Sequence, residues 1–318
     1  MQRMYVCCFD SLSRVKTLLW IERSLFHPSS RLSTAAGPIM NFHQVTTLAT
    51  QPIEGQKPGT SGLRKKTKEF ENGFYLHNFV QSTFDALVQE GVDVSDGALL
   101  IGGDGRYYND VATQVIVKIA AANGVRRIVI GKDNLLSTPA VSAIIREKGP
   151  RWQKVFGSFI LTASHNPGGP NEDFGIKYNC DNGGPAPESL TSAIYDLTTK
   201  ITAIKMCCDF PDVDIATIGT VSIPNSDASS NVIVEVVSST DEHIKLLKTI
   251  FNFDAIRALI ARPDFEMRYD CMHGVQGPYA EEVFLKELGA PASSLINAVP
   301  KNDFNGCHAD PVSLSTFH

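Results

Sequence analysis

The sequence predicts an α/β fold in which mixed, mostly parallel sheets lie between layers of helices. Short apolar runs that end in glycine or in turn residues alternate along the chain with amphipathic helical segments. Continuously apolar runs are typical of strands buried on both faces, and short connections are typical of packed strand–helix–strand layers. The composition agrees, because 43% of the residues are hydrophobic and 20% are charged, which is ordinary for a globular protein.

The helices of the first half follow from apolar periodicity and from capping residues. We expect helices at residues 74–89, 109–123, 137–148 and 188–204. Asn109 is a suitable N-cap for the second helix, and Gly124 stands where a glycine ends a helix. Ser137 is suited to cap the third helix, with Pro139 in its first turn.

The strands of the first half are the short apolar runs between these helices. We expect strands at residues 98–101, 127–130, 158–161 and 174–178. The first ends at Gly102, and the third leads into a turn that contains Asn, Pro and two glycines. Their alternation with helices predicts one largely parallel sheet with helices on both faces.

The second half begins after a segment that loses this pattern. Residues 209–231 are rich in proline, serine, asparagine and aspartate, which is typical of a connector. Beyond it we expect strands at residues 232–237, 267–270 and 294–299 and helices at residues 241–251, 253–261 and 278–288. We therefore divide the chain into residues 1–39, 40–231 and 232–318.

Residues 1–39 differ from the rest of the chain. They contain five arginine and lysine residues against Asp10 and Glu22, and serine and leucine are frequent. Such a composition is typical of an organellar transit peptide. The other interpretation is that Met40 is the functional start and that the preceding residues are a leader or a non-native extension.

The charge and the cysteines exclude several classes of protein. The net charge is −5, which argues against a large nucleic-acid interface. No stretch of about 18 apolar residues is present, so we expect no membrane span. The seven cysteines include two adjacent pairs and no Cys-x-x-Cys, which argues against a disulfide framework or a zinc site and favours a reducing compartment.

The most informative segment is LTASHNPGG at residues 161–169, which begins at the end of a predicted strand. Ligands bind at strand ends in α/β sheets, and glycines let backbone N–H groups approach an anion. The hydroxyl of Ser164 is therefore a candidate to accept a phosphoryl group. The alternative is an ordinary tight turn that carries Ser164 and His165 on the surface. No nucleophile elbow, P-loop or dinucleotide-binding motif is present.

These residues are part of a longer resemblance to the phosphoglucomutases of the α-D-phosphohexomutase superfamily. TASHNPGGPN at residues 162–171 resembles the phosphoserine loop of that family. The other segments that resemble the family, in order, are GQKPGTSGLR (55–64), GGDGR (102–106), STPAV (137–141), FGIK (174–177), NGGPAPE (182–188), MHGV (272–275) and ELGAPA (287–292). Family members start about twenty residues before TSGLR, which favours Met40 as the start.

The resemblance implies a function and a role for each matching residue. It implies interconversion of glucose 1-phosphate and glucose 6-phosphate through a phosphoserine at Ser164 and a glucose 1,6-bisphosphate intermediate. Lys177 is the implied general base, and His165 positions the acceptor or the phosphate. The implied phosphate-binding residues are Thr60, Ser61, Arg64, Arg106 and Asn166. For Arg106 the alternative is a structural ion pair, and for His165 a loop-packing role.

The family also requires Mg²⁺, held by three aspartates of a DGDGDR loop and by an oxygen of the phosphoserine. That loop is absent from this sequence, so Ser164 is the only implied metal ligand. The sequence diverges after FNGCHADP at residues 304–311, so we expect one complete phosphohexomutase domain and part of a second. We therefore expect a C-terminally truncated phosphoglucomutase that has negligible activity by itself.

The remaining expectations concern ligands and location. The implied substrate is a hexose phosphate, with glucose 1,6-bisphosphate as activator and no nucleic acid or membrane as partner. We expect a cytoplasmic monomer, with organellar targeting by residues 1–39 as the alternative. The competing function, motivated by the absent metal loop, is a non-catalytic phosphoprotein or scaffold derived from a phosphoglucomutase.

Overall fold

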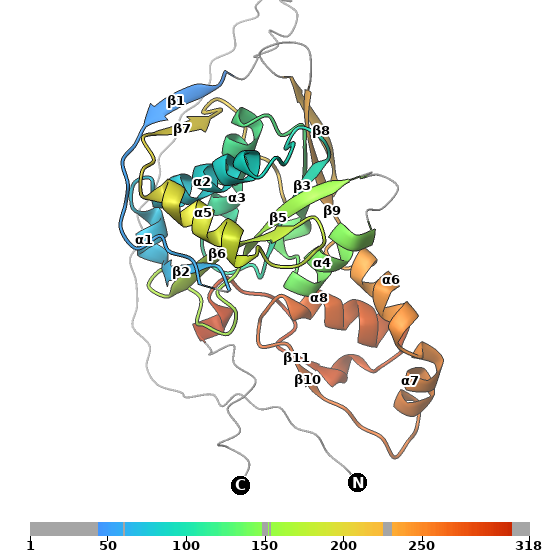
Figure 1. Ribbon diagram of the computed structural model, residues 1–318. Helices are drawn as coiled ribbons and strands as arrows, with labels where there is room; N and C mark the ends of the chain where they lie inside the picture. The colour runs from blue at the N-terminus through green and yellow to red at the C-terminus, as the bar shows by residue number, and fades with distance from the viewer. Residues whose placement is uncertain (1–43, 60, 148–151, 153, 225–230, 307–318) are drawn as a thin grey trace, which may run out of the picture.

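The structure is a computed structural model that describes residues 44–59, 61–147, 152, 154–224 and 231–306. Its main body is built on a seven-stranded sheet with the strand order β2-β6-β5-β3-β4-β9-β8 (Figure 1). The strands are β2 (Leu63–Lys66), β3 (Ala98–Gly103), β4 (Arg127–Gly131), β5 (Val155–Leu161), β6 (Asp173–Cys180), β8 (Gly219–Pro224) and β9 (Asn231–Val237).

The centre of this sheet is parallel and its margins are antiparallel. β5, β3, β4 and β9 are neighbours that run in the same direction. β6 is antiparallel to both β5 and β2, and β8 is antiparallel to β9. The mixed, mostly parallel α/β fold expected from the sequence is confirmed.

Both faces of the sheet are covered by helices, as continuously apolar strands require. Along β3, Leu99 and Ile101 belong to one hydrophobic cluster, whereas Ala98 and Leu100 belong to another. One face carries α2 (Tyr75–Gln89), α3 (Asn109–Ala122) and α5 (Glu188–Thr198), and the other carries α4 (Thr138–Glu147), against which α6 (Asp241–Ile250) packs.

Some of the predicted helix caps are present in the structure, and one is not. Ser137 accepts a weak bond from the backbone N–H of Ala140, 3.4 Å from its Oγ, and Gly124 has φ +92°, as expected. Asn109 is not the N-cap of α3, since that position is taken by Tyr108. The amide nitrogen of Asn109 instead donates to the carbonyl of Leu161 at 3.2 Å, so the side chain joins the helix to the sheet.

Three strand assignments were also wrong or incomplete. The helix expected to reach residue 204 ends at Thr198, and β7 (Ala203–Met206) pairs with β1 (Thr46–Ala49). The connector contains β8, and the strand at 232–237 does not open a separate sheet but continues the main one beside β4. β7 and β8 are short or largely exposed and lack a periodic signal, because their partners supply the hydrogen bonds and much of the burial. The strand at 232–237 was predicted, and only its place in the main sheet was not.

Smaller elements complete the chain. Beyond β9 and α6 lie α7 (Phe253–Ile260), β10 (Tyr269–Asp270), α8 (Gln276–Ala280), a π-helical segment (Glu281–Glu287) and β11 (Leu295–Ile296), which pairs with β10 in parallel. The other short elements are α1 (Thr67–Glu71) and 3₁₀ turns at Lys132–Asn134, Ala292–Ser294 and Phe304–Gly306. Within the described residues, no helix is long and apolar enough to cross a membrane.

Candidate active site

The candidate site lies at the carboxyl edge of the parallel strands. β3 and β5 are neighbours, so the loops that follow Gly103 and Leu161 lie side by side. The backbone N–H of Asp104 donates to the carbonyl of Leu161 at 3.2 Å. The sheet thus brings the GGDGR and TASHNPGG segments together at the edge where α/β proteins bind ligands.

Ser164 stands out in its loop because it is exposed and has a left-handed backbone. Its φ is +58°, a conformation that costs a non-glycine residue about 1–3 kcal/mol and is concentrated at functional sites. Its backbone N–H donates to Oγ1 of Thr162 at 3.0 Å. The serine hydroxyl is therefore presented to solvent from a backbone that its neighbours hold in place.

A buried ion pair stabilises the loop that contains Ser164. Oγ1 of Thr162 donates to Oδ2 of Asp104 at 2.6 Å, and Nη2 of Arg106 lies 2.9 Å from the same oxygen. The side chain of Arg106 has no exposed surface. Its guanidinium donates to the carbonyls of Ser164 at 3.0 Å and Asp173 at 2.8 Å. Asp104, Arg106 and Thr162 therefore form one network that fixes the Ser164 backbone.

The structure assigns Arg106 a different role from phosphate binding. Nε faces both carboxylate oxygens of Asp104, Nη2 faces Asp104 and Ser164, and Nη1 faces the carbonyls of Asn166, Pro167 and Asp173. Each nitrogen thus has at least as many acceptors as hydrogens, and no N–H remains for a phosphate. The alternative of a structural ion pair describes Arg106 better.

The side chain of Asn166 forms a hydrogen bond within the protein. Its side-chain nitrogen donates to Oδ2 of Asp173 at 2.8 Å, and the other oxygen of Asp173 lies 2.9 Å from Nζ of Lys66. Asn166 therefore ties the serine loop to β6. His165, by contrast, is exposed at the side of Ser164.

Lys177 and Arg64 supply positive charge next to this loop. Lys177 lies on β6 and Arg64 on β2, where it is paired with Gly175. Burial lowers the pKa of Lys177, and the charge of Arg64 lowers it further, while Asp104 acts in the opposite direction. A lowered pKa increases the fraction of neutral amine, which is the form that can accept a proton.

Arg64 also carries a buried donor that nothing satisfies. Its Nε is buried and has no hydrogen-bond partner, whereas nearly all buried polar atoms have one. Arg64 therefore differs from Arg106, because its Nε–H has no acceptor among the described residues.

The segment before Arg64 approaches Lys177 closely at Gly62. The φ of Gly62 is +94°, and a Cβ there would lie 2.5 Å from Cβ of Lys177 and 2.6 Å from the carbonyl oxygen of Ile176. Only glycine fits at this point. Ser61 is exposed next to it, and Thr60 lies outside the described residues.

The described residues do not form a metal site. They contain no group of three or more His, Cys, Asp or Glu side chains that could hold a metal ion. The carboxylates of Asp104 and Asp270 have other partners: Asp104 pairs with Arg106, and Asp270 accepts from Asn297 and from the backbone N–H of Met272. The residues present therefore do not fit Mg²⁺.

Residues at the end of the described chain contact the same loops, which the sequence did not predict. The ring of Phe304 lies 5.3 Å from Cζ of Arg106, and the backbone N–H of Tyr107 donates to the carbonyl of Asn302 at 2.7 Å. The sequence also missed Thr162 and Asp104 as supporting residues. Their positions immediately after β5 and β3 were the available signal.

Comparison with known proteins relates this chain to the phosphoglucomutases. Residues 55–205 match the family described as phosphoglucomutase/phosphomannomutase, alpha/beta/alpha domain I. The chain is 56% identical over 269 residues to probable cytoplasmic phosphoglucomutase 2 of Arabidopsis thaliana, covering 84% of this chain and 45% of that protein. It is 55% identical over 273 residues to the cytoplasmic phosphoglucomutase of Pisum sativum, covering 86% and 46%.

A solved structure of a phosphoglucomutase is also similar to this chain. The open form of the exocytosis-sensitive phosphoprotein pp63/parafusin, a phosphoglucomutase of Paramecium, superposes with a TM-score of 0.79 at 41% identity. The match covers 83% of this chain and 47% of that one, so the chain spans about half the length of the relatives it matches. Residues 55–205 are a domain I of the phosphoglucomutase/phosphomannomutase family.

Proposed function

We propose that this chain is the phosphoserine-bearing part of a phosphoglucomutase, an isomerase that interconverts glucose 1-phosphate and glucose 6-phosphate. The observation that carries the proposal is the exposed Ser164, whose left-handed backbone is fixed by the Asp104–Arg106–Thr162 network. The relatives' names supply the reaction. In this proposal glucose 1,6-bisphosphate is the intermediate and the activator.

The proposed step transfers a phosphoryl group from Ser164 to a sugar hydroxyl. The hydroxyl oxygen forms a bond to phosphorus while the bond between phosphorus and Oγ of Ser164 breaks. The hydroxyl proton passes to neutral Lys177, and the departing serine oxygen takes a proton from water. Such transfers depend on positioning and on neutralising charge, which Lys177 and the free N–H of Arg64 support.

The other site residues take narrower roles. Ser61, and Thr60 in the adjoining segment, bind the phosphate that is not transferred, and His165 positions the acceptor next to Ser164. Arg106 and Asn166 act through the loop and are positioning residues. No step is assigned to Mg²⁺, because the described residues do not form its site.

The experiment is incubation of the full chain with isotopically labelled glucose 1,6-bisphosphate, followed by mass spectrometry of the peptide that contains Ser164. We expect slow labelling of Ser164, no labelling in Ser164→Ala, and slower labelling in Lys177→Met. Lys200→Met, which removes an exposed lysine after α5, is the matched control. Absence of label at Ser164 in the wild-type chain would refute the proposal.

A separate prediction concerns turnover. We expect negligible magnesium-dependent conversion of glucose 1-phosphate by this chain alone, because metal ions supply a large part of the charge stabilisation in such reactions. A coupled assay for glucose 6-phosphate measures it. Turnover at the ordinary rate of a phosphoglucomutase would show that the chain holds the metal in another way.

A non-catalytic phosphoprotein or scaffold is the second candidate. The lack of a metal site among the described residues favours it. In that case a protein partner would bind equally well to wild-type chain and to Ser164→Ala and Lys177→Met, and labelling from the sugar bisphosphate would not occur. For location we propose the cytoplasm, as in the names of the plant relatives, and a monomeric state stays a prediction.

A further inference from the structure

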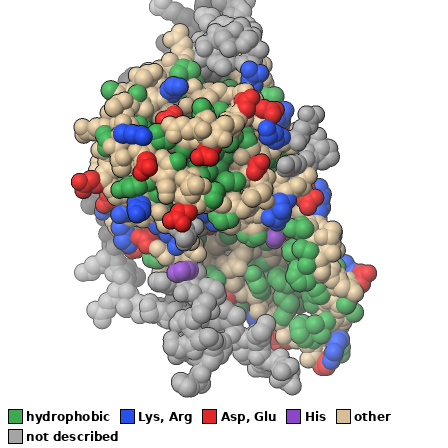
Figure 2. All heavy atoms as spheres, viewed as in Figure 1, with side chains coloured by type: hydrophobic (Ala, Val, Ile, Leu, Met, Phe, Trp, Pro, Cys, Tyr) green, Lys and Arg blue, Asp and Glu red, His purple; other side chains and the backbone are tan. Residues whose placement is uncertain are grey.

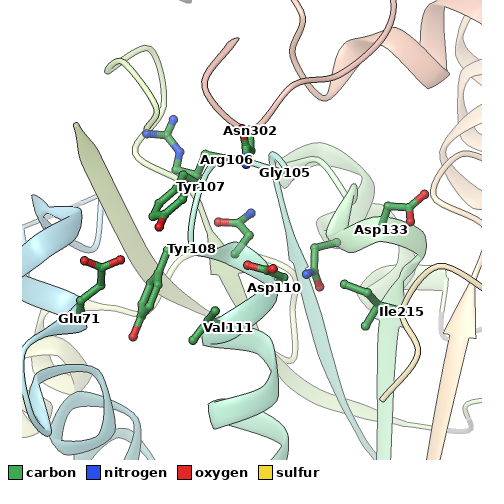
Figure 3. A pocket seen from close by; sticks show the side chains of 12 residues that line it. Glu71, Gly105, Arg106, Tyr107, Tyr108, Asp110, Val111, Asp133, Ile215 and Asn302 are labelled. Atoms are coloured by element: carbon green, nitrogen blue, oxygen red, sulfur yellow. The ribbon is translucent and has the colours of Figure 1, made fainter. Parts of the chain in front are cut away.

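A short segment near the end of the described chain, residues 302–304, lies against both loops of the candidate site. The carbonyl of Asn302 accepts a hydrogen bond at 2.7 Å from the backbone N–H of Tyr107, which directly follows the GGDGR segment. Figure 3 shows Asn302 close to Gly105 and Arg106. Phe304 is only 2% exposed, so its ring is buried at this junction between the second half of the chain and the site.

The ring of Phe304 packs against the arginine that supports Ser164. The guanidinium of Arg106 lies over this ring, with Cζ 5.3 Å from the ring centroid, which is within the range of cation–π attraction. The side chain of Arg106 has no exposed surface. An apolar ring beside a buried ion pair keeps water away from it and thereby strengthens its hydrogen bonds. Phe304 therefore contributes to the environment that holds Arg106 in place.

The same ring fits against the backbone of the serine loop (residues 162–169) at Gly168. A Cβ at Gly168 would lie 2.9 Å from Cε2 of Phe304 and 3.0 Å from the carbonyl oxygen of Asn302. Gly168 does not have a positive φ, so its backbone conformation does not require glycine. The close approach of residues 302–304 is what excludes a side chain at this position of the loop.

The backbone of this segment has an unusual conformation and is anchored in the second half. Phe304 and Asn305 have φ +51° and +60°, and a left-handed backbone is rare for a bulky residue and is concentrated at functional sites. The N–H of Phe304 donates to the carbonyl of Lys301 at 3.1 Å, and the N–H of Lys301 donates to the carbonyl of His273 at 2.9 Å. The turn thus joins the serine loop to the loop that follows β10.

We propose that Phe304 is a positioning residue for phosphoryl transfer at Ser164, an inference that rests on the proposed function. Its ring packs on Arg106, whose Nη2 donates to the carbonyl of Ser164 at 3.0 Å, and on Gly168 in the same loop. Phe304 thereby fixes the backbone that presents the serine hydroxyl, and it makes this geometry depend on the packing of the second half. It acts through the loop and needs no contact with the sugar or the phosphate.

The first measurement is the rate at which labelled glucose 1,6-bisphosphate labels Ser164 in the full chain. In Phe304→Ala we expect the rate at saturating bisphosphate to fall about tenfold, because a small displacement of a reacting group slows a reaction strongly. The bisphosphate concentration that gives half of the maximal rate should stay unchanged, since Phe304 does not touch the ligand. Phe251→Ala, which removes a 53% exposed ring from the second half, is the matched control and should label at the wild-type rate.

The second measurement is hydrogen exchange of the peptide that covers residues 162–169, without any substrate. The N–H of Ser164 donates to Oγ1 of Thr162, so its exchange reports opening of the loop. Phe304→Ala should exchange about tenfold faster than wild type in this peptide and at the wild-type rate in α2. If Phe304 contributed only to global stability, exchange would accelerate in α2 as well.

Gly168→Ala tests the same contact from the side of the loop. The added Cβ would meet the Phe304 ring, so the labelling of Ser164 should slow in the otherwise wild-type chain. In the Phe304→Ala chain the ring is absent, and the same substitution should slow labelling by a smaller factor. Equal factors would contradict a direct contact between the two residues.

Two further results would overturn the proposal. One is labelling of Phe304→Ala at the wild-type rate, and the other is exchange of its serine loop at the wild-type rate. Absence of label in the wild-type chain would instead refute the proposed function. The exchange measurement needs no substrate, so it still decides in that case whether Phe304 holds the serine loop.

Discussion

At the residue scale, two arginines with similar sequence contexts have different tasks. Arg106 and Arg64 both belong to segments that resemble phosphohexomutase motifs. In the structure, Arg106 is fully engaged with Asp104 and with carbonyls of the serine loop, whereas Nε of Arg64 is buried without a partner. The number of unpartnered donors, which depends on distant neighbours, separates Arg106 from Arg64, for which anion binding stays a proposal.

The Asp104–Arg106 pair gives a direct test of this support. We expect Arg106→Met to lower the free energy of unfolding by about 3 kcal/mol or more, because it leaves the carboxylate of Asp104 and several carbonyls without their donor. Arg262→Met is the matched control. Its pair with Asp264 is exposed on both sides, so its loss should lower the stability far less. Urea denaturation measures both, and equal losses would contradict a buried supporting role.

The buried His77 side chain should make the free energy of unfolding depend on pH. Its Nδ1 is buried without a partner, and burial lowers its pKa to about 4 from the usual 6.5. Between these values the unfolded chain binds the proton and the folded chain does not, so stability falls as the pH falls through this window. The loss attributable to His77 between pH 8 and pH 5 is about 2 kcal/mol.

The measurement is urea denaturation of wild type and His77→Gln at both pH values. Other histidines titrate as well, so the informative quantity is the difference between the two proteins. The variant should lose less stability on acidification than the wild type. Parallel pH profiles would show that His77 does not contribute.

At the element scale, the site depends on how closely β2 and β6 approach each other. The chain enters β2 through Gly62, which lies against Ile176 and Lys177 of β6. Apolar periodicity did not predict β2, because three of its four residues are Arg64, Lys65 and Lys66. Its place at the edge of the sheet is decided by pairing with β6, and this pairing brings Arg64 next to Lys177.

Substitutions at two glycines, Gly62 and Gly91, test the close approach of β2 and β6. Gly62→Ala should destabilise the fold by about 3 kcal/mol, from left-handed strain together with overpacking against backbone. Gly91 also has a positive φ, +80°, but a Cβ there would meet nothing within 4 Å. Gly91→Ala should cost only about 1 kcal/mol. Thermal or urea unfolding gives the comparison, and equal costs would mean that the backbones separate easily.

At the scale of the whole molecule, the two halves are packed to different degrees. The central strands β3 and β5 are buried along their whole length. In the second half, α7 has no buried residue, and Ile250 and Phe251 are 61% and 53% exposed. Figure 2 shows hydrophobic side chains gathered on the surface in this region. Residues after Val237 therefore have less apolar burial to stabilise them.

This contrast predicts uneven local stability. Amide hydrogens of α6 and α7 should exchange with solvent much faster than those of α4, because local opening is easiest where few apolar contacts are lost. α4 is a fair reference, since it has the same length as α6 but five buried apolar residues against one. Hydrogen exchange with mass spectrometry measures it. Equal protection would contradict the prediction of a less stable second half.

By itself, the sequence determined the alternating elements of the first half and the position of the serine loop. Those features depend on local patterns, such as apolar runs, helix-ending glycines and the TASHNPGG segment. Only the tertiary structure decided that β9 continues the main sheet and that the pKa of Lys177 is lowered. It also decided that the N–H groups of the Arg106 guanidinium already have acceptors within the protein. Strand partners, donor counts and desolvation are set by residues far away in the chain, and a local pattern carries no information about them.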